Sequence, residues 1–138
     1  TYEACYHVIY YDIASKSTIG WGHLIKPRED FSAGITEDQA LTLLAQDLAP
    51  RVAAVVACLE VAVTQEQFDS ATSLLYNIGE KAFRESSFLR SVNSKASNQE
   101  IVANLLLWDK SRNPKTGKLE VSSGLRRRRI DESRAWPP

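Results

Sequence analysis

Three residues near the start of the chain, Glu3, Asp12 and Thr18, carry the functional groups needed to cleave a glycosidic bond. Eight residues separate the glutamate from the aspartate, and five separate the aspartate from the threonine. In such a reaction one carboxyl group protonates the leaving oxygen, and a second carboxylate orients the attacking water. The threonine hydroxyl can hold the same water. No other cluster in the sequence offers so complete a set, so these three residues are our catalytic candidates.

The sequence around the two carboxyl groups suits different roles. A general acid must stay protonated near neutral pH, and burial against apolar groups favours the protonated form. Glu3 lies between Tyr2 and Ala4, in an apolar stretch, whereas Asp12 lies beside a polar turn, where it can stay ionised. Because Glu, Asp and Thr are common residues, the spacing alone also fits three structural roles. Glu3 would be a solvated terminal residue, Asp12 a turn residue and Thr18 an ordinary strand residue.

The elements expected around these candidates are β-strands. Val8-Ile9-Tyr10-Tyr11 is β-branched and aromatic, and a second such run, residues 18–25, follows a polar break. This pattern predicts a hairpin that folds Thr18 back toward Asp12, with a third short strand before Gly34.

The rest of the chain has helical patterns. Three capping boxes, beginning at Thr36, Thr64 and Ser97, predict helix starts, because each is followed three residues later by Gln or Glu. Pro50 is expected to interrupt or restart the first of these helices, since proline lacks an N–H. Gly79 is expected to end the second helix, because glycine is common just after the last helical residue.

Two further helices are predicted, a short one over residues 83–92 and a last one that begins near Ser122 or Ser123 and runs toward Trp136. Residues 113–117 have the composition of a turn. We therefore predict an α+β fold, with a small β-rich part at about residues 8–33 and a helical part at about residues 35–136.

Composition limits the functional classes. The 138 residues fit a single domain, 1–138, and a zero net charge, from 17 basic and 17 acidic residues, argues against nucleic-acid binding. The sequence lacks an uninterrupted apolar run of 18 residues, so we expect no stable membrane insertion. Cys5 and Cys58 are expected to be buried free thiols, and we expect no metal or cofactor.

For Trp21 and His23, which follow Thr18 closely, and for one run of charged residues, we expect a structural role before a functional one. We expect His23 to pair with Asp69 or a backbone carbonyl, and Trp21 to pack in the core or line a cleft. The run Arg126-Arg127-Arg128-Arg129 is expected on the solvated face of the last helix, with Asp131 and Glu132 as partners. A functional alternative for this run is attraction to an anionic polymer.

The run Tyr11-Asp12 with Thr18-Ile19-Gly20-Trp21-Gly22-His23 resembles the phage-type lysozymes, glycoside hydrolase family 24, which includes the T4 and lambdoid phage lysozymes. Further blocks resemble the family in the same order along the chain: Gly34-Ile35-Thr36, Gln67-Phe68-Asp69, Tyr76-Asn77-Ile78-Gly79, Ser86-Ser87-Phe88-Leu89-Arg90, Trp108, and Gly124-Leu125 with Arg127-Arg128 and Glu132. Together these blocks span nearly the whole chain.

The resemblance implies a lysozyme-like fold with a cleft between two lobes, and a muramidase that hydrolyses the β-1,4 bond between N-acetylmuramic acid and N-acetylglucosamine in peptidoglycan. It implies that Glu3 is the general acid and that Asp12 with Thr18 positions the water, with inversion as the usual outcome. It also implies a saccharide site that includes the residues Tyr76, Asn77, His23 and Trp21.

The resemblance further implies a monomer without cofactors that acts on peptidoglycan glycan strands in the bacterial cell wall, in the periplasm or outside the cell. A phage endolysin would be made in the host cytoplasm and then released or exported. Ala4 and Ser15 stand where the family usually has glycine. Two alternatives stay open: a lytic transglycosylase, which uses one Glu and needs no water-holding pair, and a weakened module that binds peptidoglycan.

Overall fold

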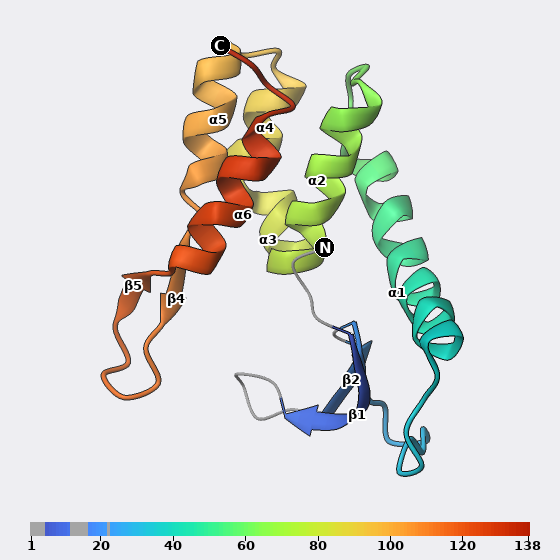
Figure 1. Cartoon of the computed structure of the whole chain (residues 1–138). Helices are drawn as coiled ribbons and strands as arrows, with labels where there is room; N and C mark the ends of the chain where they lie inside the picture. The colour runs from blue at the N-terminus through green and yellow to red at the C-terminus, as the bar shows by residue number, and fades with distance from the viewer. Residues whose placement is uncertain (1–4, 12–16, 22) are drawn as a thin grey trace. The chain divides into compact units, whose positions relative to one another are not determined.

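A computed structural model of the chain describes residues 5–11, 17–21 and 23–138 (Figure 1). Contacts divide the chain into two compact units, Thr1–Pro50 and Arg51–Pro138. The described elements combine strands and helices, which confirms the predicted α+β class. Asp12 and Glu3 lie outside the described residues.

The first unit contains an antiparallel sheet with the strand order β1-β2-β3. Its strands are β1 (Tyr6–Tyr11), β2 (Ser17–Gly20) and β3 (His23–Leu24). The predicted hairpin is therefore confirmed, but the single strand expected over residues 18–25 is two strands, because the chain turns at Trp21. Ile19 pairs with His23 across this turn, so the histidine is fixed directly beside the central strand.

A close backbone contact joins β1 to the segment that follows the sheet. The Ile35 N–H donates to the His7 carbonyl at 2.8 Å. The preceding residue, Gly34, has φ +78°, and a Cβ there would lie 2.7 Å from the same carbonyl oxygen. Only glycine avoids both the strained conformation and the clash at this position.

Helix α1 (Glu37–Cys58) begins as its sequence predicts. The Thr36 N–H donates to the Gln39 side chain at 2.8 Å, and the Gln39 N–H donates to the Thr36 hydroxyl at 3.2 Å. The expected interruption at Pro50 is wrong, because α1 continues through it. Proline removes one helical hydrogen bond, and the buried residues Ala54 and Val55 beyond it hold the helix in the core.

By length and composition alone, α1 is long and apolar enough to cross a membrane, and it is the one such helix in the described part of the chain. The sequence has no uninterrupted apolar run of 18 residues, so it did not predict this property of α1. A core helix of a soluble protein meets the same criteria, so the property by itself is weak evidence for a membrane segment.

The second unit is built from helices whose starts are capped by side chains. Helix α2 (Gln65–Ile78) has a complete capping box at Thr64, and the N–H of Gly79 closes its end by donating to Leu75. The helix predicted over residues 83–92 is two helices, α3 (Glu80–Glu85) and α4 (Ser87–Asn93). Ser86 separates them, because its hydroxyl accepts from the Leu89 N–H at 3.1 Å and so caps a new helix.

The last part of the chain contains α5 (Asn98–Leu106), the antiparallel strands β4 (Lys110–Arg112) and β5 (Leu119–Val121), and α6 (Ser123–Ser133). The sequence predicted the turn at residues 113–117 but not the two strands that it joins. Helix α6 begins at the expected cap, Ser122, but ends before Trp136.

The described core of the second unit is formed by aromatic and aliphatic side chains of α1, α2, α3, α4 and α5. Helix α6 itself contributes none of these side chains, but Trp136, just after it, does. Phe88 and Trp136 meet edge to face at a centroid distance of 5.3 Å, a geometry favoured by aromatic quadrupoles. Other buried members include Val55, Leu74, Leu75, Phe83, Leu89, Ile101 and Leu105.

Candidate functional site

Thr18 is the catalytic candidate that the structure describes. It lies on the central strand β2, where it pairs with Tyr10 of β1 and Leu24 of β3. Its side chain is buried, with 1% exposed. A hydroxyl on the central strand of a sheet has a fixed direction, which suits a group that must hold one water molecule in one place.

His23 is held by two carboxylates within the first unit. Its Nδ1 lies 2.9 and 3.0 Å from the carboxylate oxygens of Asp47, and its Nε2 lies 2.9 Å from Oε1 of Glu29. The ring also meets Phe31 edge to face at 5.9 Å. The structural interpretation of His23 is thus supported, but the expected partner Asp69 is wrong: that carboxylate accepts from Gln65 in α2.

The protonation of His23 follows from these contacts. Burial lowers the pKa of His23, but the hydrogen bonds to Glu29 and to Asp47 outweigh burial and raise it overall. The pKa of Glu29 is lowered, chiefly because the Lys26 N–H donates to its carboxylate, and then by His23. The three side chains therefore favour an imidazolium between two carboxylates.

The other three residues expected to contact saccharide lie in different places. Trp21 is half-buried in the turn between β2 and β3, whereas Tyr76 and Asn77 are half-buried near the end of α2. The Arg51 guanidinium lies 4.6 Å from the centre of the Tyr76 ring. This cation–π contact restricts the orientation of the Tyr76 ring.

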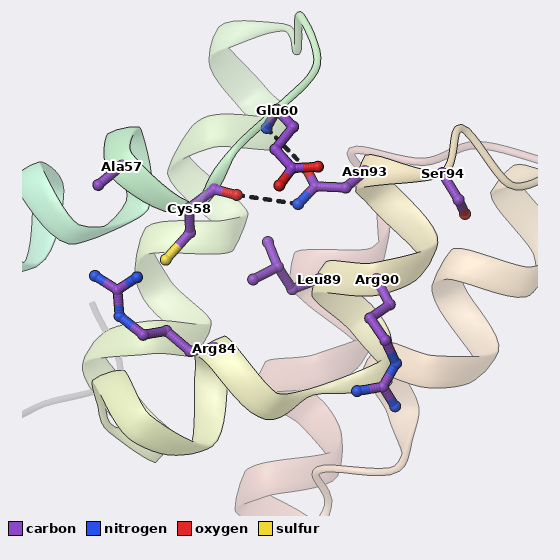
Figure 2. Close-up of a pocket in the computed structure, with 8 residues that line it drawn as sticks. All are labelled: Ala57, Cys58, Glu60, Arg84, Leu89, Arg90, Asn93 and Ser94. Atoms are coloured by element: carbon purple, nitrogen blue, oxygen red, sulfur yellow. Dashed lines mark hydrogen bonds between the residues drawn. The ribbon is translucent and has the colours of Figure 1, made fainter.

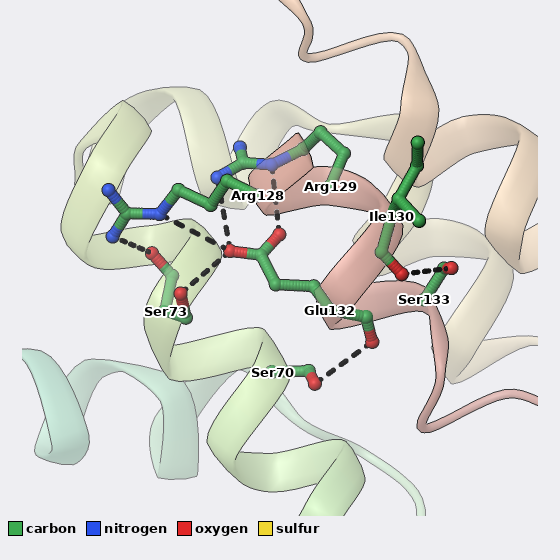
Figure 3. A network of polar contacts seen from close by, with 7 residues as sticks. All are labelled: Ser70, Ser73, Arg128, Arg129, Ile130, Glu132 and Ser133. Carbon is green, nitrogen blue, oxygen red and sulfur yellow. Dashed lines mark hydrogen bonds and ion pairs between the residues drawn. The ribbon is translucent and has the colours of Figure 1, made fainter. Parts of the chain in front are cut away.

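A buried ionic network joins α6 to α2 (Figure 3), and the sequence interpretation missed it. Arg128, Arg129 and Glu132 are 7%, 0% and 4% exposed. Nε of Arg129 lies 2.9 Å from the Glu132 carboxylate, and Nε of Arg128 lies 3.6 Å from it. The expectation of a solvated arginine run is therefore wrong for two of its four members, although Glu132 is a partner as predicted.

Serine side chains of α2 complete the network. The Ser73 hydroxyl donates to the Glu132 carboxylate at 2.7 Å, and the Ser70 hydroxyl donates to the Glu132 backbone carbonyl at 3.0 Å. Burial raises the pKa of Glu132, an effect that Arg129, Ser73 and Arg128 oppose without cancelling. Because this carboxyl is enclosed, it is suited to holding α6 and not to protonating a substrate.

A hollow of about 510 Å³ in the second unit lies between the end of α1 and the helices α3 and α4 (Figure 2). Asn93 spans its rim, because its side chain donates to the Cys58 carbonyl and accepts from the Glu60 N–H, both at 3.0 Å. Cys58 is a buried free thiol, as predicted, whereas Cys5, also free, is only partly buried.

The described residues contain no group of three or more histidine, cysteine, aspartate or glutamate side chains that could hold a metal ion.

Comparison with known proteins places the chain in a family. The family model described as phage lysozyme matches residues 1–132. An endolysin of Bacillus phage PZA is 39% identical over 118 residues, and an endolysin of Acyrthosiphon pisum secondary endosymbiont phage 1 is 34% identical over 125 residues. These matches cover 83% and 86% of the chain.

The length of the relatives differs. The chain spans 42% of the Bacillus phage PZA protein and 78% of the endosymbiont phage protein. Among solved structures, the muramidase domain of SpmX from Asticaccaulis excentricus is 32% identical with a TM-score of 0.85, and the match covers 98% of this chain and 88% of that one. A family match across nearly the whole sequence, with the same fold in a solved relative, shows that the chain belongs to the phage lysozyme family.

Proposed function

We propose that the chain is a muramidase that hydrolyses the β-1,4 bond between N-acetylmuramic acid and N-acetylglucosamine in peptidoglycan. The observation that carries the proposal is the family match over residues 1–132, a range that contains all three catalytic candidates. Two relatives are named endolysins and one solved relative is named a muramidase domain.

The proposed mechanism assigns one role to each candidate. Glu3 donates a proton to the glycosidic oxygen as its bond to the anomeric carbon breaks. Water attacks that carbon, and Asp12 accepts the proton that the water loses, while Thr18 holds the water. Attack on the face opposite the leaving group inverts the anomeric centre. The buried position of Thr18 on β2 supports its role as a fixed hydrogen-bonding group.

For substrate binding we propose that Tyr76, Asn77 and Trp21 contact the sugars, and that His23 supports the sheet that carries Trp21. Aromatic rings provide apolar faces for saccharides, and the Arg51 contact supports a fixed orientation for Tyr76. Both ring nitrogens of His23 are engaged by carboxylates, so its contribution is to hold the sheet in place beside the substrate.

We further propose that residues 1–138 act as one muramidase domain, monomeric and without a cofactor, on the bacterial cell wall. Sedimentation velocity tests the oligomeric state, because a dimer would contradict this part of the proposal.

The decisive experiment incubates the chain with purified peptidoglycan and analyses the products by mass spectrometry. We expect a fall in turbidity and reducing ends that each carry the mass of an added water. A 1,6-anhydro end, lighter by one water, would instead identify a lytic transglycosylase. Binding without any cleavage would identify a peptidoglycan-binding module, for which the replacements Ala4 and Ser15 are the sequence features.

A further inference from the structure

The side chains of His23, Glu29 and Asp47, which we call the His23 clamp, join three separate segments of the first unit. His23 lies on β3, Asp47 lies on α1, and Glu29 lies in the loop between them. Nδ1 of His23 lies 2.9 Å from an Asp47 carboxylate oxygen, and Nε2 lies 2.9 Å from Oε1 of Glu29. Because the ring is buried and both of its nitrogens are engaged, the clamp holds β3 on α1 in one arrangement.

The register of the sheet places the clamp and the Thr18 side chain on opposite faces. Ile19 pairs with His23, and Thr18 pairs with Leu24. Directly opposed residues on paired strands share a face, and successive residues alternate between the two faces. His23 therefore does not reach a water held by Thr18, and it acts on that hydroxyl only through the backbone of β3 and β2.

Strand β3 depends on the clamp because it has little else to hold it. It has two residues and lies at the edge of the described sheet, and its second residue, Leu24, is 47% exposed. Short strand pairs are marginally stable in water. The neighbouring strand β2 has an apolar attachment instead, since Ile19 is fully buried and a Cβ on Gly20 would lie 3.5 Å from the Ala40 Cβ.

The loop side of the clamp is itself fixed. The Glu29 N–H donates to the Lys26 carbonyl at 3.0 Å, and the Lys26 N–H donates to the Glu29 carboxylate at 2.8 Å. Glu29 and Asp47 are the described charged groups that act on the imidazole, and Lys26 acts in turn on Glu29. A protonated ring has a donor for each carboxylate, whereas a neutral ring has one donor for two carboxylates. Loss of the proton therefore releases one side of the clamp.

We propose that His23 is a positioning residue for the attacking water: the clamp holds β3, and β3 acts through β2 to set the direction of the Thr18 hydroxyl. The inference rests on the proposed function and deepens it, because it assigns the control of the water-holding group to the charge of a histidine behind the sheet. Catalysis is sensitive to such placement, since a displacement of about 1 Å can lower a rate roughly 10²-fold.

A double-mutant cycle with Thr18 distinguishes positioning from general support of the fold. His23→Gln, Thr18→Val and the combined variant are assayed on peptidoglycan at about pH 5.5, below the ordinary pKa of histidine. We expect His23→Gln to lower kcat about tenfold and to change KM less than about twofold, because the water and not the sugar is misplaced. In the Thr18→Val chain the same change should lower kcat less than about twofold further. Single-turnover reactions at high enzyme concentration keep the slow variants measurable.

Equal losses in the two backgrounds would mean that His23 supports the fold in general, and would overturn the proposal. The matched control is His7→Gln, which removes the other histidine of the chain from an exposed position on β1. It should change kcat less than about twofold. Glu29→Gln releases only the loop side of the clamp and serves where His23→Gln does not fold. It should lower kcat about threefold, and an unchanged kcat would contradict the proposal.

Methyl NMR of Thr18 tests the positioning without any need for cleavage. In the intact chain with labelled threonine methyl groups, the order parameter of the Thr18 methyl should fall as the pH rises through the titration of His23, followed in the same samples. Against the effect of burial, Glu29 and Asp47 raise the pKa of His23, so Asp47→Asn should move both the titration and the loss of order to lower pH. The methyl of Thr72, buried in α2 of the second unit, should keep its order.

The two measurements separate this proposal from the proposed function. If the wild-type chain releases no reducing ends from peptidoglycan, the muramidase proposal fails, while the Thr18 methyl still decides whether the clamp orders that residue. A Thr18 methyl whose order does not follow His23 would overturn the inference even in an active enzyme. If the order follows His23 but the losses of kcat are additive, the clamp orders Thr18 without setting the rate, and the positioning role is wrong.

Discussion

Among individual residues, Thr18 and His23 show how the small sheet can position chemistry. Thr18 has a buried hydroxyl on the central strand β2. His23 lies on the neighbouring strand β3, and the carboxylates of Glu29 and Asp47 fix its ring. The sequence predicted Thr18 through its spacing from Asp12. It did not predict that Asp47 and Glu29 hold His23, because Asp47 is 24 residues distant and no local pattern links the two.

Glu3→Gln should abolish the clearing of peptidoglycan, with a loss of roughly 10²-fold or more because the general acid is removed. The fold should be retained, as measured by circular dichroism and thermal unfolding. Glu66→Gln changes an exposed carboxyl in α2 and serves as the matched control. Full activity of the Glu3 variant would remove this residue from the acid role.

Asp12→Asn should reduce the rate less than Glu3→Gln does, but by more than about tenfold, because an amide orients water without accepting its proton. Steady-state release of reducing ends measures the effect. An unchanged rate would contradict the assignment of Asp12 to the water.

The pH dependence of unfolding should reveal the His23 cluster. The raised pKa of His23 means that its contribution is complete below about pH 6.5, the value in the unfolded chain, and is lost as the pH rises through the folded value. The lowered pKa of Glu29 means that its contribution is lost as the pH falls below about 4.3. The stabilisation should therefore be largest between about pH 4.3 and 6.5.

Thermal unfolding of the wild-type chain and of His23→Gln from pH 4 to 9 measures this contribution. The difference in Tm should be largest near pH 5.5 and should shrink toward pH 9. Hydrogen bonds to charged groups contribute about 1.5–3 kcal/mol each. A constant difference across this range would contradict a protonated His23.

Among the elements, the starts of α1, α2, α5 and α6 follow closely from the sequence, because a cap is a local pattern. The hairpin of β4 and β5 could not be predicted from the sequence. Each strand has only three residues, so the strands are recognised by their pairing and not by their composition. The break at Ser86 was missed for a similar reason: apolar periodicity runs through it, and only the serine cap to Leu89 separates α3 from α4.

Pro50→Ala should stabilise α1, because it restores a backbone donor in the middle of a continuous helix. Interior proline costs about 3 kcal/mol relative to alanine, and relaxation around Pro50 reduces what is recovered. We expect a gain of about 1–3 kcal/mol in the free energy of unfolding, measured with urea. Ala53→Gly, on an exposed position of the same helix, should lose about 1 kcal/mol. No gain for Pro50→Ala would show that the helix is already fully adapted to proline.

Glu132→Ala should strongly destabilise the packing of α6 on α2, because it removes the carboxylate that Arg128 and Arg129 both contact. Removing one partner of a buried ion pair costs about 3–5 kcal/mol. Urea unfolding measures the change, and Asp131→Ala, at a neighbouring and more exposed position, provides the control. A change below about 1 kcal/mol would mean that the network contributes little. The burial of the two arginines was not predictable, because four consecutive arginines have no apolar periodicity.

At the level of the whole molecule, the described hydrophobic core cluster lies entirely within residues 54–136. A fragment of residues 37–138 retains that core and all of α1. We therefore expect it to unfold cooperatively by heat and by urea, with near-native helical circular dichroism. A gradual transition would show that the first unit is required for the second to fold.

The imidazolium of His23 has a spectroscopic consequence. Both ring nitrogens lie within hydrogen-bond distance of carboxylates in a buried position, so in the protonated form that the raised pKa favours their protons should exchange slowly with water and give resolved downfield NMR signals. Those signals belong to the first unit alone. Their exchange rate would therefore report local opening of the small sheet, separately from global unfolding of the helical core, in the intact chain and without any label.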